Sequence, residues 1–491
     1  MASLDGGIAE SLKNKSILLT GSTGFLAKIF VEKVLRVQPQ VKRLFLIVRA
    51  ADLKSATLRI HDEVLKKDLF RVLKEKHGSG FESFFWSKVS PVVGDIAMEG
   101  LGMVDACVQE EISREVDVIV NVAATTSFDE RYDSALRINA LGAMHVLDFA
   151  KTCQKLEMLL HVSTAYVAGS ETGLIPETAF RMGQTLAGNS TLDIEAEVQL
   201  MTKRLEELRA DGATKEAERS AMKHLGLQRA KLFGWPNTYV FTKAMGEMLI
   251  GEKRGDIPVV ILRPTVIEST YYDPFPGWME GTRTVDSLLV NYCKGKLTSF
   301  LADGELILDV IPGDMVVNSM IVSMAVHSGD RGSQFIYHVG SSVQNPVRYS
   351  KIVECGYRYF KANPCYGKDG KPIIVREVSL FSNMESFRRY MALYHKLPLG
   401  GLYLANQAFC KLFNSTYNNL TRKYNFVMYL AELYEPYVFF KGRFEDKNSD
   451  VLRSKINDSE AKLFDFDPKS INWEDYIMKI HIPGIIKYVL R

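Results

Sequence analysis

A glycine-rich turn after a short apolar run, near the start of the chain, most constrains the fold. Residues Ser16–Thr20 are apolar enough for a buried parallel strand, and Phe25–Val37 follow helical periodicity. Between these two segments, Gly21, Gly24 and Ala27 form a G-x-x-G-x-x-A pattern that extends into the helix. The first glycine allows a tight turn, the second lets the backbone approach a pyrophosphate, and the small alanine permits close helix–strand packing. This unit predicts a dinucleotide-binding domain.

Further apolar runs repeat the pattern along the chain. Each run is short enough for a buried strand, and helical stretches separate the runs. Strands that alternate with helices favour a parallel sheet with right-handed crossovers. The predicted fold class is therefore α/β, a Rossmann-type doubly wound parallel sheet. The runs are 44–48, Val89–Val93, 116–122, Met158–Val162 and 259–262.

The length of 491 residues is too great for one typical core and predicts two domains. We expect a dinucleotide-binding domain over 1–345 and a mainly helical C-terminal domain over 346–491, where 390–440 is helical and rich in Leu, Tyr and Phe. An insertion at about 170–235 predicts one or two amphipathic surface helices. It is either a solvated excursion or a cover over a substrate channel.

Composition excludes several classes of protein. Sixty-one Lys and Arg against 58 Asp and Glu give a formal charge of +3, which offers no support for nucleic-acid binding. The six cysteines form no Cys-x-x-Cys pair, so we expect reduced thiols in the cytoplasm and no metal site. The first fifteen residues lack the apolar core of a secretory signal. No run of about 18 apolar residues predicts a spanning helix.

The first turn and the end of the second strand predict the cofactor. Arg49 ends the second strand, where an acidic residue would bind a ribose 2′-hydroxyl. Its guanidinium instead offers a fork for a 2′-phosphate, which favours NADPH. Asp52, three residues further on, keeps NADH open as an alternative. The cofactor-binding residues expected in the turn itself are Gly21, Thr23, Gly24, Phe25 and Leu26.

Two later strand ends complete the predicted cofactor site. Asp95 and Ile96 follow the third strand, where Asp95 could accept a hydrogen bond from an adenine amino group. Alternatively, Asp95 caps the next turn. Asn121 and Ala123 follow the fourth strand, and the small residues there would let the backbone pass close to the nicotinamide-side ribose.

A tyrosine and a lysine four positions apart predict carbonyl chemistry. Tyr239 and Lys243 would share one face of a helix, because residues i and i+4 are neighbours there. A nearby ammonium favours the phenolate, so we expect Lys243 to lower the pKa of Tyr239 for proton exchange with a carbonyl oxygen. Thr164 is our first choice for a hydroxyl that holds this carbonyl, and Ser163 the second. Both could instead only satisfy backbone groups at a strand end.

The order of these motifs resembles an extended short-chain dehydrogenase/reductase. Longer segments resemble the alcohol-forming fatty acyl-CoA reductases, above all their plant branch. They include 122–132 (V-A-A-T-T-S-F-D-E-R-Y), 160–167, 234–247 (G-W-P-N-T-Y-V-F-T-K-A-M-G-E), 268–281 and 464–484. The resemblance covers nearly the whole chain, and Ala27 replaces a glycine that many of those enzymes carry.

The resemblance implies reduction of a long-chain fatty acyl-CoA by NADPH, through an aldehyde, to a primary alcohol for lipid, wax or suberin-type metabolism. Lys243 would also bind ribose hydroxyls. The alternatives are a reductase that stops at the aldehyde, or another extended short-chain carbonyl reductase or epimerase. The stretches 271–278 and 424–440 could line an acyl channel or be ordinary core. Residues 439–441 could touch a membrane surface, which suggests a cytoplasmic protein with peripheral association at the endoplasmic reticulum.

Overall fold

The computed structural model describes residues 6–188, 190–282, 284–367 and 369–490. A seven-stranded sheet in the order β12-β7-β5-β4-β1-β2-β3 forms its centre, and every pairing within it is parallel. This confirms the predicted α/β class. The strands are β1 Ser16–Thr20, β2 Arg43–Val48, β3 Val89–Val93, β4 Val118–Asn121, β5 Met158–Val162, β7 Val259–Pro264 and β12 Gln334–Val339.

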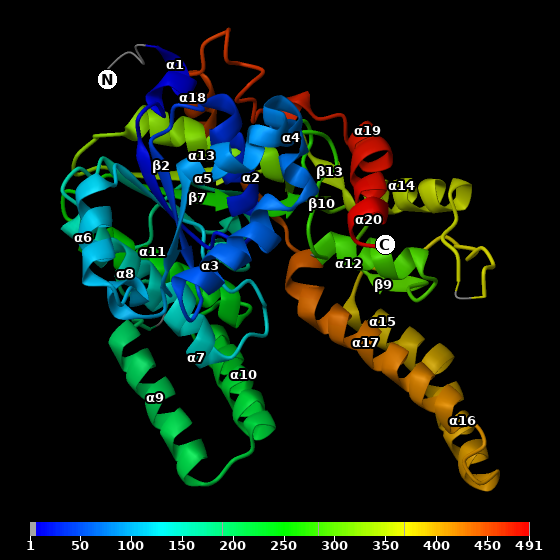
Figure 1. Cartoon of the computed structure of the whole chain (residues 1–491). Helices are drawn as coiled ribbons and strands as arrows, with labels where there is room; N and C mark the ends of the chain where they lie inside the picture. The colour runs from blue at the N-terminus through cyan, green and yellow to red at the C-terminus, as the bar shows by residue number, and fades with distance from the viewer. Residues whose placement is uncertain (1–5, 189, 283, 368, 491) are drawn as a thin grey trace.

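Helices cover both faces of this sheet because its strands are apolar on both faces (Figure 1). Alternate strand residues belong to two clusters: Leu19 and Leu160 pack with α2 and α13, and Leu18 and Leu159 pack with α6, α8 and α11. The helices named are α2 Phe25–Val37, α6 Ala106–Glu115, α8 Gly142–Thr152, α11 Thr238–Lys253 and α13 Gly313–His327. The other helices up to the insertion are α1 Gly7–Ser11, α3 Leu53–Ile60, α4 Arg71–His77, α5 Phe81–Lys88 and α7 Tyr132–Ala135.

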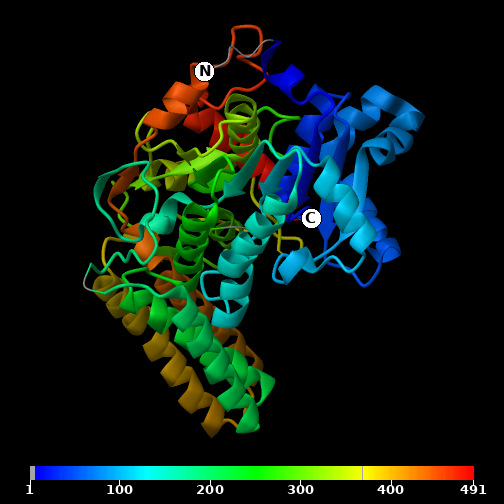
Figure 2. The ribbon, with the colours of Figure 1, turned by 90° about the vertical axis from the view of Figure 1, so that its left-hand side faces the viewer.

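The insertion forms a helical hairpin, α9 Ile194–Ala210 and α10 Lys215–Leu232, that extends away from the sheet (Figures 1 and 2). One or two surface helices were predicted here, and the structure has two. Asp193 and Thr214 cap the two N-termini with side-chain oxygens. Glu197 of α9 accepts hydrogen bonds from Tyr132 and Arg229, which ties the hairpin to the body. None of the insertion residues that the structure describes lines the central cavity. The insertion is therefore better described as a solvated excursion, a hairpin exposed to solvent, than as a cover over a substrate channel.

The last third of the chain does not stand apart from the sheet domain. The described residues form four two-stranded sheets, and three of them join the predicted domains directly. In these three, β9 Ser299–Leu301 pairs with β14 Ser379–Phe381, β6 Gly173–Ile175 with β15 Gly442–Phe444, and β10 Ile307–Leu308 with β13 Val347–Arg348. The fourth, β8 Val266–Glu268 with β11 Val310–Pro312, lies within the first predicted domain. The boundary at 345 stays a prediction.

Helices dominate the C-terminal region, as predicted. The longest is α17, whose N-terminal half pairs with α16 in a second projecting hairpin (Figure 1). The helices are α12 Thr284–Cys293, α14 Tyr349–Ala362, α15 Met384–Met391, α16 Leu397–Ala408, α17 Asn414–Val438, α18 Lys447–Arg453, α19 Trp473–Asp475 and α20 Ile482–Tyr488. No helix in the described part of the chain is long and apolar enough to span a bilayer.

Candidate active site

The glycine-rich turn lies where the loops after β1 and β4 meet. Gly21 has a φ of +68°, and a Cβ atom there would lie 2.8 Å from both the N and the Cα of Ala123. A side chain at this position would therefore be strained and would clash with backbone. Helix α2 begins at Phe25, and its N-cap residue, Gly24, provides no side-chain hydrogen bond. The first-turn amides are left for an anionic ligand, which fits the pyrophosphate of a dinucleotide.

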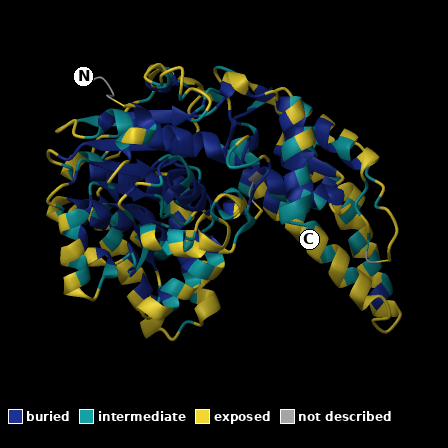
Figure 3. Cartoon of the chain, turned by 45° about the horizontal axis from the view of Figure 1, so that its top comes forward, coloured by how far each residue is buried: buried dark blue, intermediate teal, exposed yellow. Residues whose placement is uncertain are grey.

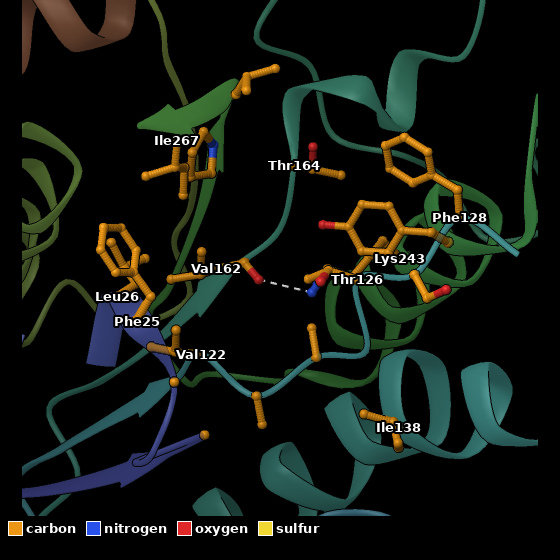
Figure 4. Close-up of a pocket in the computed structure, with 18 of the residues that line it drawn as sticks. Phe25, Leu26, Val122, Thr126, Phe128, Ile138, Val162, Thr164, Lys243 and Ile267 are labelled. Atoms are coloured by element: carbon orange, nitrogen blue, oxygen red, sulfur yellow. Dashed lines mark hydrogen bonds between the residues drawn. The ribbon is translucent and has the colours of Figure 1, made fainter. Parts of the chain in front are cut away.

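A cavity of about 750 Å³ runs from this turn across the carboxyl ends of the strands. In Figure 4, Phe25 and Leu26 lie on one side of it, and Phe128 and Lys243 lie on the opposite side. All but one of the predicted site residues line it, and the exception, Asn121, lies buried behind the wall. Those that line it are Gly21, Thr23, Gly24, Phe25, Leu26, Arg49, Asp95, Ile96, Ala123, Ser163, Thr164, Tyr239 and Lys243.

Two arginines stand at the β2 end of the cavity, and only one was predicted. Arg49 is exposed, and its backbone carbonyl accepts a hydrogen bond from Nη1 of Arg59 at 2.6 Å. Arg59, which also lines the cavity, pairs with Glu63. It follows Arg49 by ten residues on a separate element, so no motif indicated it. Asp52 caps α3, because its carboxylate accepts a hydrogen bond from the Ser55 amide at 2.7 Å. This carboxylate, which would favour NADH if it bound a ribose hydroxyl, is therefore already engaged by the backbone.

Asp95 caps the turn that follows β3, as the alternative prediction had it, and it also lines the cavity. Its carboxylate accepts a hydrogen bond from the backbone N–H of Ala97 at 3.0 Å, and its own N–H donates to the carbonyl of Leu101 at 2.7 Å. Asp95 therefore shapes the turn after β3 while it lines the cavity. A contact with adenine stays a prediction.

A buried chain of polar groups links the glycine-rich strand to Lys243. The Thr20 hydroxyl lies 2.6 Å from Oδ1 of Asn121, whose amide nitrogen lies 2.9 Å from Nδ1 of His161. Nε2 of His161 lies 3.1 Å from Nζ of Lys243, and this ammonium donates to the carbonyl of Val162 at 2.8 Å (Figure 4). Asn121 therefore acts through His161 to position Lys243. His161 is itself buried, and both of its ring nitrogens contact polar partners, one of which is a predicted catalytic group.

Burial shifts the pKa values of Tyr239, Lys243 and His161. Desolvation raises the pKa of Tyr239 to about 12, and a hydrogen bond with Thr164 opposes that rise. The net shift of the Tyr239 pKa is therefore upward, where the sequence predicted a downward one, because desolvation is the largest cause. Desolvation also lowers the pKa of Lys243 to about 8, while Glu247 raises it. The pKa of His161 is held well below its usual value by burial and by the Lys243 charge, so the ring is neutral.

The two hydroxyls at the end of β5 have different surroundings. Oγ1 of Thr164 accepts a hydrogen bond from the backbone N–H of Tyr166 at 3.3 Å and also bonds with Tyr239. Ser163 is buried, and its Oγ has no hydrogen-bond partner among the described residues. A buried hydroxyl without a partner is costly unless a ligand satisfies it. Ser163 is thus as well placed as Thr164 to donate to a substrate oxygen.

The segment before Tyr239 sets the position of its helix. Oδ1 of Asn237 caps α11 by accepting from the N–H of Val240 at 3.1 Å. Its amide group donates to the hydroxyl of Tyr437 at 2.5 Å, which couples α11 to α17, 200 residues further along the chain. Trp235 is buried, and its indole donates to the carbonyl of Val167 at 2.8 Å. The W-P-N-T segment therefore fixes the helix that carries Tyr239 and Lys243 against two other parts of the fold.

Comparison with known proteins identifies the family. Two family models, both described as Male sterility protein, match residues 19–320 and 394–491. The Arabidopsis thaliana protein named "Probable fatty acyl-CoA reductase 4" is 51% identical over 99% of this chain and 100% of its own length. The chain belongs to the fatty acyl-CoA reductase family. It is an oxidoreductase with a nicotinamide-cofactor domain.

Further relatives agree with this assignment. The alcohol-forming fatty acyl-CoA reductase of Simmondsia chinensis is 49% identical over 99% of both chains. Among solved structures, a reductase domain of a non-ribosomal peptide synthetase from Mycobacterium tuberculosis superposes with a TM-score of 0.58 over 99% of this chain and 97% of its own, at 17% identity. At that identity the likeness concerns the fold alone.

An aromatic wall from the C-terminal region completes the cavity of this reductase. Phe128 stacks between Tyr239 and Tyr437, with ring centroids 6.0 and 4.7 Å away. Five residues of α17 line the cavity: Tyr429, Leu433, Tyr434, Tyr437 and Val438. This confirms that part of the 424–440 stretch lines the cavity. The other stretch, 271–278, contributes no lining residue among those described, and its Trp278 stacks on Phe25 in the core.

One buried cluster in the reductase has the composition of a metal site. Nε2 of His481 lies 3.1 Å from Oε2 of Glu268 and 3.2 Å from Oδ1 of Asp286. The three donor atoms lie within 4.8 Å of one another. His481 also contacts the Ser269 hydroxyl through Nδ1 at 3.0 Å. Because Nε2 of His481 lies within ion-pair distance of both carboxylates, we interpret the cluster as a contact that links the C-terminal segment to the sheet domain. The absence of a metal site stays a prediction.

Proposed function

We propose that this reductase converts a long-chain fatty acyl-CoA to a primary alcohol in two successive carbonyl reductions, with an aldehyde as intermediate. The single observation that carries the proposal is the position of Tyr239. Its phenol lies in one cavity with the dinucleotide-type turn at one end and the aromatic wall of α17 at the other. The full-length similarity to alcohol-forming relatives supports the same chemistry.

Different side chains would donate the proton, stabilise the charge that results and hold the carbonyl oxygen. With a pKa of about 12, Tyr239 is a phenol at neutral pH and can donate its proton to the oxygen that develops negative charge during reduction. The Lys243 ammonium, four residues along the same helix, would stabilise the phenolate that remains. The hydroxyls of Ser163 and Thr164 would hold the carbonyl oxygen. A bound reduced nicotinamide supplies the hydride to the carbonyl carbon.

One site can serve both reductions because each puts a proton on a carbonyl oxygen. The first reduction turns the thioester into a thiohemiacetal, which breaks its C–S bond and releases CoA as the thiol. The aldehyde that remains presents the same oxygen to Tyr239, Ser163 and Thr164. The apolar side chains of α17 at the cavity wall suit the alkyl chain, which loses contact with water as it enters.

A count of cofactor consumed per product tests the proposal. Purified protein with a long-chain acyl-CoA should oxidise two NADPH for each alcohol formed, because four electrons separate a thioester from an alcohol. NADPH oxidation is followed by absorbance and the products by chromatography. One NADPH per molecule of accumulated aldehyde would support the aldehyde-stopping alternative instead, and no oxidation with any acyl-CoA would refute the proposal.

We propose NADPH rather than NADH as the donor, on the basis of Arg49. A charged fork at a 2′-phosphate contributes about 1.5–3 kcal/mol, so Arg49→Ala should raise the KM for NADPH about tenfold or more. The KM for NADH should hardly change, since NADH lacks that phosphate. Arg114→Ala, which removes an exposed arginine of α6 paired with Glu110, is the matched control. An unchanged KM for NADPH in Arg49→Ala would refute this role.

We further propose that the reductase works in the cytoplasm, at the surface of the endoplasmic reticulum. The six cysteines are free thiols, as expected in a reducing compartment. Of the residues 439–441 expected at a membrane surface, Phe440 is buried and stacks on Phe444 at 5.5 Å, so it belongs to the core. Phe439 is half-buried and Lys441 is exposed, and a membrane contact through these two stays a prediction.

A further inference from the structure

The hairpin of α16 and α17 exposes an unusual amount of apolar surface. It extends from the body on the same side as the α9–α10 hairpin, and both views show its end far from the sheet (Figures 1 and 2). Figure 3 colours much of the α16–α17 hairpin as exposed. We call residues 393–429 the arm. Eleven of the 25 exposed large apolar side chains in the described chain belong to it: Leu393, Tyr394, Leu397, Tyr403, Leu404, Phe409, Leu412, Phe413, Leu420, Phe426 and Tyr429.

The charges of the arm all have one sign. Between Glu385 and Glu432 the sequence contains no Asp or Glu. The same stretch carries six basic residues, and four of them belong to the arm: Lys396, Lys411, Arg422 and Lys423. The other two, Arg388 and Arg389, precede the arm and pair with Glu432 and Glu385. The α9–α10 hairpin offers an internal comparison, because it projects on the same side of the molecule but has eight acidic residues between 193 and 232. Projection from the body therefore does not by itself explain the composition of the arm.

The arm is a folded element with a fixed turn. The N–H of Phe413 donates to Oδ1 of Asn406 at 2.9 Å, and the Asn406 side chain is buried although it lies near the end of the hairpin. The rings of Tyr403 and Tyr417 pack at 5.6 Å and join the two helices. Large side chains such as Leu404 (68% exposed) and Leu412 (75% exposed) nevertheless point away from the protein. Water is a poor environment for such a surface, which marks an interaction site.

We propose that the arm is a membrane-docking element that lies in the interface of a bilayer containing acidic lipids. Its apolar side chains would enter the boundary between headgroups and acyl chains, and its Lys and Arg side chains would meet the lipid phosphates. A stretch without a single carboxylate avoids repulsion from an anionic surface. The arm docks without spanning, because no described helix meets the requirements for a span.

Docking would also bring the cavity to the lipid surface, an extension that rests on the proposed function. Helix α17 begins in the arm and ends at the active site, where Tyr437 stacks on Phe128. Tyr429 belongs to both regions, since it is 45% exposed and lines the cavity. A long-chain acyl group that partitions into the bilayer would then have a short path along α17 to Tyr239, and the alcohol would have the same path back.

Flotation of the full-length protein with vesicles tests the docking independently of catalysis. We expect it to float with phosphatidylcholine vesicles that contain 30% phosphatidylserine and much less with pure phosphatidylcholine. The double variant Leu404→Glu/Leu412→Glu should lose binding by about tenfold or more, because it removes two exposed apolar groups that would enter the bilayer and adds two carboxylates. The matched control, Leu200→Glu/Leu227→Glu on the α9–α10 hairpin, should bind like the wild type.

A second variant separates charge from apolar contact. Arg422→Ala/Lys423→Ala should weaken binding to the acidic vesicles about fivefold for each charge removed. Binding of the wild type should also fall as salt rises. The proposal is overturned if the wild type does not float, or if both arm variants float like the wild type.

A second copy of the chain is the competing occupant of this surface. A wild type that is dimeric in light scattering, is made monomeric by Leu404→Glu/Leu412→Glu, and does not float would assign the arm to self-association and overturn the membrane proposal. Turnover of a short, water-soluble acyl-CoA should be equal in the wild type and this variant. Equal turnover shows that a loss of flotation is not misfolding, while absence of turnover in both speaks against the proposed function and leaves the binding result intact.

Discussion

Replacement of Tyr239 by phenylalanine should lower kcat for both carbonyl reductions by about 10²- to 10⁴-fold, the range that general acid catalysis contributes. The substitution removes only the phenolic hydroxyl. The ring stacked on Phe128 at 6.0 Å remains, so the fold and the cavity wall should persist. The hydrogen bond that Thr164 makes with the phenol is lost, but its contact with the N–H of Tyr166 is not. Rates of NADPH oxidation and of alcohol formation measure the effect.

Binding of NADPH by Tyr239→Phe, measured by fluorescence, should stay within a few-fold of the wild type, because the lost group acts on the substrate oxygen. Tyr366→Phe, at a residue that is 69% exposed and does not line the cavity, controls for the chemical change. Alcohol production by Tyr239→Phe at the wild-type rate would show that another group donates the proton. The hydroxyls of Ser163 and Thr164 would then be the next candidates.

Replacement of Lys243 by methionine should lower kcat/KM by about 10²- to 10³-fold, the effect of removing one preorganised charge from an active site. Lys243 is buried, and its ammonium bonds with Val162 and His161, so its position is fixed before substrate arrives. Methionine has a similar length and no charge. Lys253→Met, at the exposed end of the same helix, is the control and should keep full activity. A Lys243→Met enzyme with normal kcat/KM would remove this residue from the mechanism.

The pKa of Lys243 predicts the alkaline limb of the pH profile. Desolvation brings this pKa down to about 8, so the group is an ammonium below pH 8 and a neutral amine above it. If the charged form is the active one, kcat/KM should fall as pH rises through about 8. In Lys243→Arg, the guanidinium stays charged, and whatever activity remains should lose this limb. A limb at pH 8 that persists in Lys243→Arg would assign it to another group.

Local sequence pattern predicted much of the fold correctly. The bounds predicted for β1 and α2 agree with those found, because a buried parallel strand and an amphipathic helix each have a characteristic apolar period. The edge strand β12 was not predicted. It pairs only with β7, and its first two residues are half-buried, so it lacks the continuous apolar run of the central strands. The short pairs β14–β9 and β15–β6 were also missed, since each joins segments that are far apart in the chain.

The active-site residues divide in the same way, into those that a local sequence pattern predicted and those that it did not. Gly21, Ser163, Thr164, Tyr239 and Lys243 could be named because each belongs to a short motif next to a strand or on one helical face. Arg59, Phe128 and the α17 residues of the wall could not be named individually, because no local spacing relates them to those motifs.

The sequence by itself determined the local units of this reductase: the strand–turn–helix with its glycines, and the helix that presents a tyrosine and a lysine on one face. Only the tertiary structure decided what surrounds them. Contacts such as that between Asn237 and Tyr437 bring α17 to the active site, and desolvation there moves the pKa of Tyr239 up and that of Lys243 down. The physical reason is that hydrogen-bond spacing and periodicity act over a few residues, whereas burial depends on every segment that packs around a group.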